Sequence, residues 1–190
     1  MRKLSCLCFA VAALSSGSAS AIATYKNWDG SQYVYPFGCS NTTTYGQVIT
    51  VPHSKHTLEK FTFWWANYSS GSMVVRAEVY QWDGTKATGS AVFESDPRTI
   101  SFKNPDFHKV TFPATVAVTP GAQYVLFASI DKDYEQCTDS YLLKWGLVAD
   151  ETYPDGTFVY QNNGGDESQW TSSAWSTYGG DLAFRVPLGP

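Results

Sequence analysis

Hydrophobic and polar residues alternate with a period of two through most of this chain, and no segment sustains a helical period. The clearest case is Leu58–Asn67, where Phe61, Phe63 and Trp65 share one face of an extended chain. Trp64 falls on the opposite face. Such alternation is typical of half-buried β-strands, and clusters of Gly, Pro, Asn and Asp separate the segments. The expected strands are Gln47–Val51, Leu58–Asn67, Ser72–Trp82, Ala91–Glu94, Phe107–Phe112, Gln123–Ile130, Tyr141–Leu147, Phe158–Tyr160 and Asp181–Val186.

The number and spacing of these segments predict one all-β domain. In the segment 72–82, the residues expected on the core face are Val75, Ala77 and Val79, and alternation in the segment 141–147 places on one face Tyr141, Leu143, Trp145 and Leu147. About nine or ten short strands at close spacing are typical of an antiparallel β-sandwich, and we expect it to be jelly-roll-like. The 190 residues contain no fixed-period repeat and no low-complexity linker, so we expect a single sandwich domain over residues 22–190.

Residues 1–21 have the pattern of a secretory signal peptide. The basic pair Arg2-Lys3 precedes the apolar run Leu4–Leu14, and an A-x-A cleavage site follows at Ala19-Ser20-Ala21. A second site two residues later makes either Ile22 or Thr24 the expected first residue of the mature chain. The compact segment is typical of bacterial export. We therefore expect a secreted or cell-surface protein whose mature chain has no transmembrane segment.

Composition and charge agree with a secreted β protein. Aromatic residues make up 16% of the chain and charged residues 16%, with a formal charge of −4. Removal of Arg2 and Lys3 takes two positive charges away and leaves −6, which argues against a nucleic-acid partner. It also removes two of the four cysteines. The remaining pair, Cys39 and Cys137, is expected to form one disulfide between two loops in an oxidising compartment.

Two strands carry aromatic and charged residues on their expected outer faces. If 58–67 and 72–82 pair as neighbours, one sheet face holds Trp64, Arg76, Glu78, Tyr80 and Trp82. Flat rings beside hydrogen-bonding groups are typical of carbohydrate-binding faces, so these residues form the candidate glycan site. The alternative is that a strand or loop covers this face and the rings are ordinary packing. That arrangement is the more frequent one, because exterior Tyr and Trp often form cross-strand pairs.

Candidate metal and catalytic residues are few. Asp131, Asp133 and Glu135 alternate after an expected strand and form a candidate structural calcium site. A solvated acidic loop is the commoner explanation, since the segment lacks a glycine-centred calcium loop. The histidines are His53, His56 and His108. None adjoins a nucleophile motif, and no catalytic motif occurs, so we expect a non-enzymatic protein without a cofactor.

Four blocks resemble a group of exported bacterial proteins, many of which carry a PEP-CTERM sorting tail. The blocks are Ala77–Gly89 with its Trp82-Asp83-Gly84 core, Pro120–Phe127, Lys144–Leu147 and Gly180–Phe184. The resemblance covers about Gln47 to Phe184. It implies a secreted or surface-associated all-β domain with no assigned reaction, linked to exopolysaccharide and biofilm matrix. After Phe184 the sequence shows no Pro-Glu-Pro and no apolar helix, so we expect release or matrix binding rather than membrane-anchored sorting.

These observations support two main hypotheses. The first is a secreted, non-enzymatic β-sandwich that binds a surface or matrix component, with polysaccharide as the expected partner. The second is a structural or interaction protein of the cell envelope or biofilm matrix that acts through protein–protein contacts. A glycan hydrolase is a weaker third hypothesis, because no pair of carboxylates has a spacing that singles it out.

Overall fold

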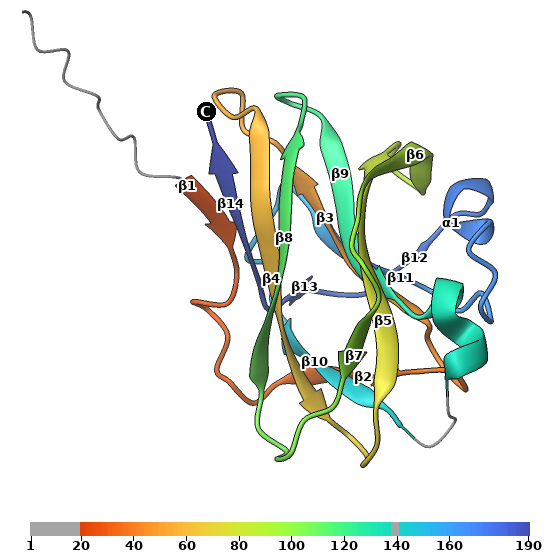
Figure 1. The fold of residues 1–190 in the computed structure, drawn as a ribbon. Coiled ribbons are helices and arrows are strands. Elements are labelled where there is room, and N and C mark those ends of the chain that lie inside the picture. Colours follow the sequence, from red (N-terminus) through yellow and green to blue (C-terminus); the bar gives the residue numbers. More distant parts are fainter. Residues whose placement is uncertain (1–19, 138–140) are drawn as a thin grey trace, which may run out of the picture.

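A computed structural model describes residues 20–137 and 141–190, which form two packed antiparallel β-sheets (Figure 1). The sheets do not close into a barrel, and the predicted all-β sandwich is confirmed. Residues 1–19, with most of the predicted signal peptide, lie outside the described residues. Both predicted cleavage sites fall within or at the end of the first strand, β1 (Ser20–Ala23). Within the described ranges, no helix has the length and apolar character needed to cross a membrane.

The first sheet is organised around β4 (Thr57–Asn67), its longest strand. β8 pairs along one side of β4, whereas β14 and β10 share the other side. β1 pairs with β14, and both β2 and β13 pair with β10. The bounds of these partners are β2 Tyr33–Phe37, β8 His108–Ala117, β10 Leu143–Val148, β13 Asp181–Leu182 and β14 Phe184–Gly189.

The second sheet has the order β12-β11-β3-β9-β5-β6, and β7 pairs with β5. β6 pairs with the second half of β5 and β7 with its beginning. The bounds are β3 Thr44–Thr50, β5 Met73–Trp82, β6 Ala87–Glu94, β7 Arg98–Ile100, β9 Gln123–Ser129, β11 Thr157–Gln161 and β12 Ser176–Thr177. Since β4 and β5 belong to different sheets, the short connection between them crosses from one layer to the other.

The core lies between the sheets and follows the predicted alternation. Phe61, Phe63 and Trp65 of β4 are buried, and so are the core-face residues predicted for 72–82. The residues that alternation places on one face of 141–147 are buried as well. Aromatic rings dominate the centre, where the ring centroids of Trp65 and Trp145 are 4.5 Å apart. Burial of each large side chain contributes on the order of 2–3 kcal/mol, so this paired set is a main source of stability.

A disulfide and a covering segment complete the fold. Cys39, just after β2, pairs with Cys137 at the end of the 3-10 helix η1 (Asp131–Gln136). The predicted pair lies at disulfide distance, with Cα atoms 6.0 Å apart, and links the two layers. The segment 162–178, which holds the short helix α1 (Gln169–Ser172), folds over the outer face of the second sheet.

Candidate functional site

The five residues of the predicted glycan face do not lie on one surface. Trp64 is on the outer face of β4 in the first sheet, whereas Arg76, Glu78, Tyr80 and Trp82 follow β5 in the second. The prediction required β4 and β5 to pair, and β5 pairs with β9, β6 and β7 instead. Alternation assigns side chains to the faces of one strand, but it contains no information about which strand lies next to it.

The segment 162–178 covers the aromatic part of the β5 face. The ring centroid of Tyr80 is 6.2 Å from that of Trp170, and the Trp82 ring meets Trp175 edge-on at 5.7 Å. Tyr80 is only 9% exposed as a result. These two rings are therefore packing residues under a loop, the second of the two arrangements that the sequence left open.

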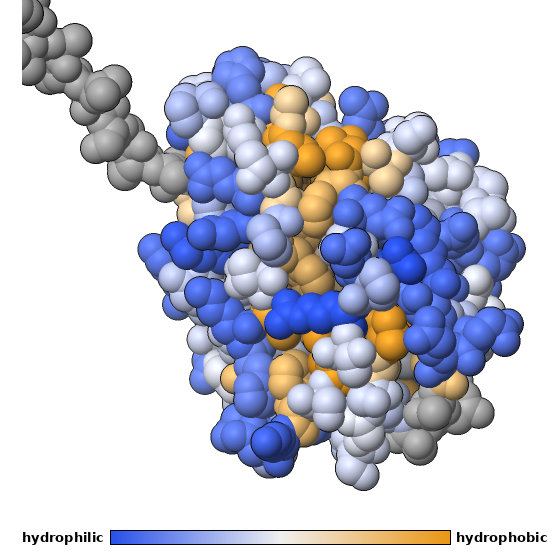
Figure 2. Space-filling view, viewed as in Figure 1, coloured by the Kyte–Doolittle hydropathy of each residue, from blue (hydrophilic) through white to orange (hydrophobic). Residues whose placement is uncertain are grey.

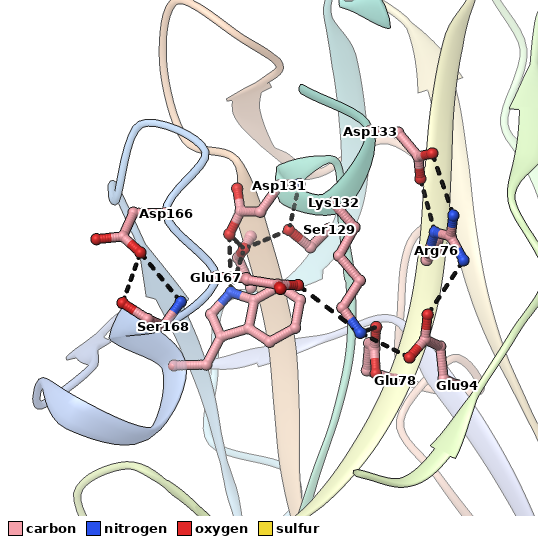
Figure 3. A network of polar contacts seen from close by, with 12 residues as sticks. Arg76, Glu78, Glu94, Ser129, Asp131, Lys132, Asp133, Asp166, Glu167 and Ser168 are labelled. Atoms are coloured by element: carbon pink, nitrogen blue, oxygen red, sulfur yellow. Dashed lines mark hydrogen bonds and ion pairs between the residues drawn. The ribbon is translucent and has the colours of Figure 1, made fainter. Parts of the chain in front are cut away.

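The charged residues of the β5 face belong to a polar network between β5, β6, η1 and the covering segment (Figure 3). The Arg76 guanidinium donates to both carboxylate oxygens of Asp133, at 2.8 and 3.3 Å, and contacts Glu94 at 3.1 Å. The Lys132 ammonium extends from η1 to Glu78 at 3.2 Å and to Glu94 at 2.6 Å. Each cation is thus shared between carboxylates, and this arrangement clamps η1 to the sheet.

Glu78 is the most deeply buried acid of this network, with 0% exposure. Lys132 lies within ion-pair distance, but neither Glu78 oxygen receives a hydrogen bond from the described residues. Burial raises the pKa of Glu78 from 4.5 to about 7, and the positive charge of Lys132 opposes part of that rise. A buried carboxyl of this kind has no path to a substrate, so the geometry supports a structural role.

The three acids of the predicted calcium site point to separate partners. Asp131 accepts a hydrogen bond from the Trp170 indole at 2.8 Å, Asp133 is held by Arg76, and Glu135 is exposed. Within residues 20–137 and 141–190, no group of three or more His, Cys, Asp or Glu side chains is placed to hold a metal ion. The structure therefore does not bring Asp131, Asp133 and Glu135 together as ligands.

The histidines lie at two separate places in the fold. His108 stacks on Phe102 at 4.3 Å and shares a hydrogen bond with Asn104 at 2.7 Å. His53 and His56 are exposed in the turn between β3 and β4. No arrangement of a nucleophile with a base emerges from their positions.

A different set of rings forms a continuous surface on the outside of the first sheet. We call it the aromatic strip, and its members in spatial order are Tyr25, Trp64, Trp28, Phe107, Tyr33, Tyr35 and Tyr68. Neighbouring ring centroids along it are between 4.6 and 6.5 Å apart. Trp64 is the one predicted face residue that belongs to it. The strip therefore joins rings from β2, β4 and three loops.

The loop before β2 is held in a defined shape, which positions Trp28. The Trp28 indole donates to the Gln32 carbonyl at 2.7 Å, and its ring lies against Gly146 of β10, where a side chain would collide with it. The Asp29 carboxylate accepts from the backbone N–H groups of Ser31 and Gln32 at 2.8 and 2.9 Å. These hydrogen bonds lower the pKa of Asp29, so it remains ionised and keeps the loop closed.

One end of the aromatic strip is the most exposed. Tyr33, Tyr35 and Tyr68 are 41%, 46% and 50% exposed, and Tyr35 stacks on Tyr68 with centroids 4.6 Å apart. The Lys144 ammonium lies over the Tyr33 ring at 4.8 Å. Exposed aromatic area of this extent is typical of an interaction site. The flat rings offer stacking surfaces, and Lys144 adds a hydrogen-bond donor.

The sequence contains a signal for part of this strip. Tyr33 and Tyr35 alternate as strand residues do, but Pro36 next to them favoured a turn, and β2 was not among the predicted strands. Tyr25 and Trp28 sit in an irregular loop, and no periodic pattern could have placed them beside Trp64.

A second surface feature lies at the edge of the sandwich where β8 and β6 are the outermost strands. Figure 2 shows a hydrophobic strip along the opening between β8 of the first sheet and β6 and β7 of the second. A hollow of about 400 Å³ there is lined in part by Phe93, Pro97 and Phe112. Arg98 bridges the opening, since its guanidinium lies 5.6 Å from the Phe112 ring and donates to the Thr111 carbonyl at 3.2 Å. This contact links the two sheets.

Comparison of the chain with protein-family models and with curated proteins finds no match. The function is therefore inferred from the geometry and chemistry of the surface residues described above.

Proposed function

We propose that this protein is a secreted, non-enzymatic β-sandwich that binds polysaccharide through the aromatic strip. The observation that carries the proposal is the unbroken series of seven rings, whose exposed end holds Tyr33, Tyr35 and Tyr68. Sugar rings present apolar C–H faces that stack on aromatic rings, and a row of such rings suits several sugar units in sequence. Extracellular location follows from the predicted signal peptide and is supported by the disulfide.

The chemistry around the strip supports a glycan better than an apolar partner. Lys144 lies directly over Tyr33, and Asp29 and Ser31 are exposed on the loop that carries Trp28. Polar groups interleaved with rings can satisfy sugar hydroxyls, which act as both donors and acceptors. An interface core for a protein partner is usually depleted in charged groups. The strip is therefore assigned to a hydroxyl-rich ligand.

The test is retention of the purified mature protein on insoluble polysaccharides and on an array of soluble glycans. Tyr33→Ala and Tyr68→Ala should each weaken binding about fivefold, if one ring contact contributes about 1 kcal/mol. Trp82→Ala is the matched control, because this aromatic residue lies on the second sheet, and it should bind like wild type. Thermal melting of each variant verifies that it is folded.

Two results would overturn the proposal. One is the absence of retention on every glycan. The other is unchanged binding in Tyr33→Ala and Tyr68→Ala. Concentration-dependent association in analytical ultracentrifugation that these substitutions abolish, without glycan binding, would favour the protein–protein alternative.

A further inference from the structure

A cavity of about 200 Å³ opens at the edge of the sandwich, next to the exposed end of the aromatic strip. It lies between β2 of the first sheet and β11 of the second, and we call it the edge cavity. Its lining residues are Val34, Tyr35, Thr42, Tyr45, Phe158, Tyr160, Asn162 and Tyr178. At roughly 30 Å³ per water molecule, the volume would hold six or seven waters. That is the size of one sugar ring, and a disaccharide could not enter whole.

The walls of the edge cavity combine aromatic faces with neutral hydrogen-bonding groups. Phe158 is 0% exposed and supports the exposed ring of Tyr178 from within the core, with ring centroids 5.3 Å apart and that of Tyr45 5.2 Å away on its other side. Burial raises the pKa of Tyr45 to about 12, so its phenol remains protonated. Thr42 and Asn162 add a hydroxyl and an amide to the lining. The exposed rings of Tyr35 and Tyr178 can stack on a sugar ring, and the exposed amide of Asn162 can exchange hydrogen bonds with its hydroxyls.

The lining of the edge cavity carries no formal charge. All eight lining residues lie in the described part of the chain, and none is Asp, Glu, Lys, Arg or His. A carboxylate or sulfate brought into such a site would lose its hydration without gaining a counter-charge, which is costly. A neutral hydroxylated ring meets no such penalty. The lining therefore discriminates by charge as well as by size.

Tyr35 connects the edge cavity to the aromatic strip. It stacks on Tyr68 at the end of the strip and also lines the cavity. Tyr178, which is 44% exposed, stands on the second sheet's side of the same cavity. A glycan laid along the strip would thus reach the cavity with one of its units.

We propose that the edge cavity binds a single uncharged sugar unit, at the terminus or a branch of the polysaccharide that lies on the strip. This inference rests on the proposed function and adds to it the class of sugar. The edge cavity selects for a neutral sugar unit, and the aromatic strip contacts the neighbouring units of the polysaccharide.

The experiment titrates the protein with neutral gluco-, manno- and galacto-oligosaccharides and with oligogalacturonate as the charged counterpart, by isothermal calorimetry. Tyr178→Ala and Asn162→Ala change exposed residues of the cavity and should fold. Each should weaken binding of the neutral oligosaccharide about fivefold to tenfold. Wild type should bind the neutral oligosaccharide at least tenfold more tightly than oligogalacturonate. Trp82→Ala should bind like wild type.

The outcomes separate the two proposals. If Tyr33→Ala weakens binding but Tyr178→Ala and Asn162→Ala do not, the edge-cavity proposal is refuted and the strip proposal stands. Equal affinity for oligogalacturonate would also refute the neutral-sugar assignment. Choline that competes with the oligosaccharide, and loses affinity in Tyr178→Ala, would identify the cavity as a cation cage instead. Wild type that binds no glycan would overturn both proposals.

Discussion

The buried carboxyl of Glu78 should make the folded protein less stable as the pH rises. Its pKa is raised from 4.5 to about 7 in the folded state, first by burial. The folded protein therefore holds this proton more tightly than the unfolded chain does. The associated stability is fully present below about pH 4.5 and is lost as the pH rises through about 7.

The size of the effect follows from the same two values. A shift from 4.5 to about 7, at 1.36 kcal/mol per pH unit, corresponds to about 3 kcal/mol. The favourable charge of Lys132, 3.2 Å away, is already included in that shift. Glu78 has no exposed surface, so solvent screening does not reduce the effect further. A loss of about 3 kcal/mol is a large share of a domain's usual 5–15 kcal/mol.

Glu78→Gln tests this reasoning, because glutamine has nearly the same shape and cannot ionise. Near pH 4.5 the variant should match wild type. At pH 8 it should be more stable by up to about 3 kcal/mol. Lys132 would keep Glu94 as a partner at 2.6 Å, so the variant leaves no unpaired cation. The assay is urea unfolding at pH 4.5, 6, 7 and 8, followed by tryptophan fluorescence with the disulfide intact.

The difference between the two proteins is the measured quantity, rather than the slope of wild type alone. Burial also raises the pKa of Asp181, which adds a pH dependence of the same sign to both proteins. Glu135→Gln, in an exposed residue of η1, controls for the loss of one negative charge. A stability difference between wild type and Glu78→Gln that stays constant from pH 4.5 to 8, or that changes with the opposite sign, would refute the argument.

Three other variants test the scaffold. Gly180→Ala should lower the unfolding free energy by about 2 kcal/mol or more in urea melts, because φ is +91° and a Cβ would overlap a backbone oxygen of β10. Replacing both Cys39 and Cys137 with Ser should cost up to about 4–5 kcal/mol, measured by thermal melting, since the two cysteines are 98 positions apart in the sequence. Trp170→Phe removes a hydrogen bond to buried Asp131 and should cost about 1–3 kcal/mol, with faster proteolysis of the segment 162–178. If any of these variants unfolds with the same stability as wild type, the feature that it alters does not stabilise the fold as argued.

The candidate site was less predictable than the fold. The outward position of Trp64 was correct, because it follows from alternation within β4. Its neighbours were wrong, since Tyr80 and Trp82 lie on the other sheet and the partners of Trp64 are Tyr25 and Trp28. Those two rings come from an irregular loop, where side-chain direction depends on hydrogen bonds such as that of the Trp28 indole.

The position of the segment 162–178 over the second sheet was also not predictable from the sequence. Its sequence is rich in Gly, Asn and Ser, as expected of a loop, and gives no sign of covering a sheet. The segment is held over the sheet by Trp170 and Trp175, whose ring centroids lie 4.9 and 5.2 Å from that of Phe127. Such contacts join residues distant in sequence, and a local pattern cannot specify them.

The sequence by itself predicted most of the longer strands, the inward face of strands with clear alternation such as β4, and the pairing of Cys39 with Cys137. The strand faces follow from local physics, because an extended backbone places successive side chains on opposite faces. The cysteine pair followed from the prediction that Cys6 and Cys8 are removed with a signal peptide. The tertiary structure decided which strands lie side by side, and therefore which rings form one surface. Backbone hydrogen bonds between strands are nearly independent of side-chain identity, so the neighbours are selected only when the whole core packs. Tyr33, Tyr35 and Tyr68 became one exposed surface at that step.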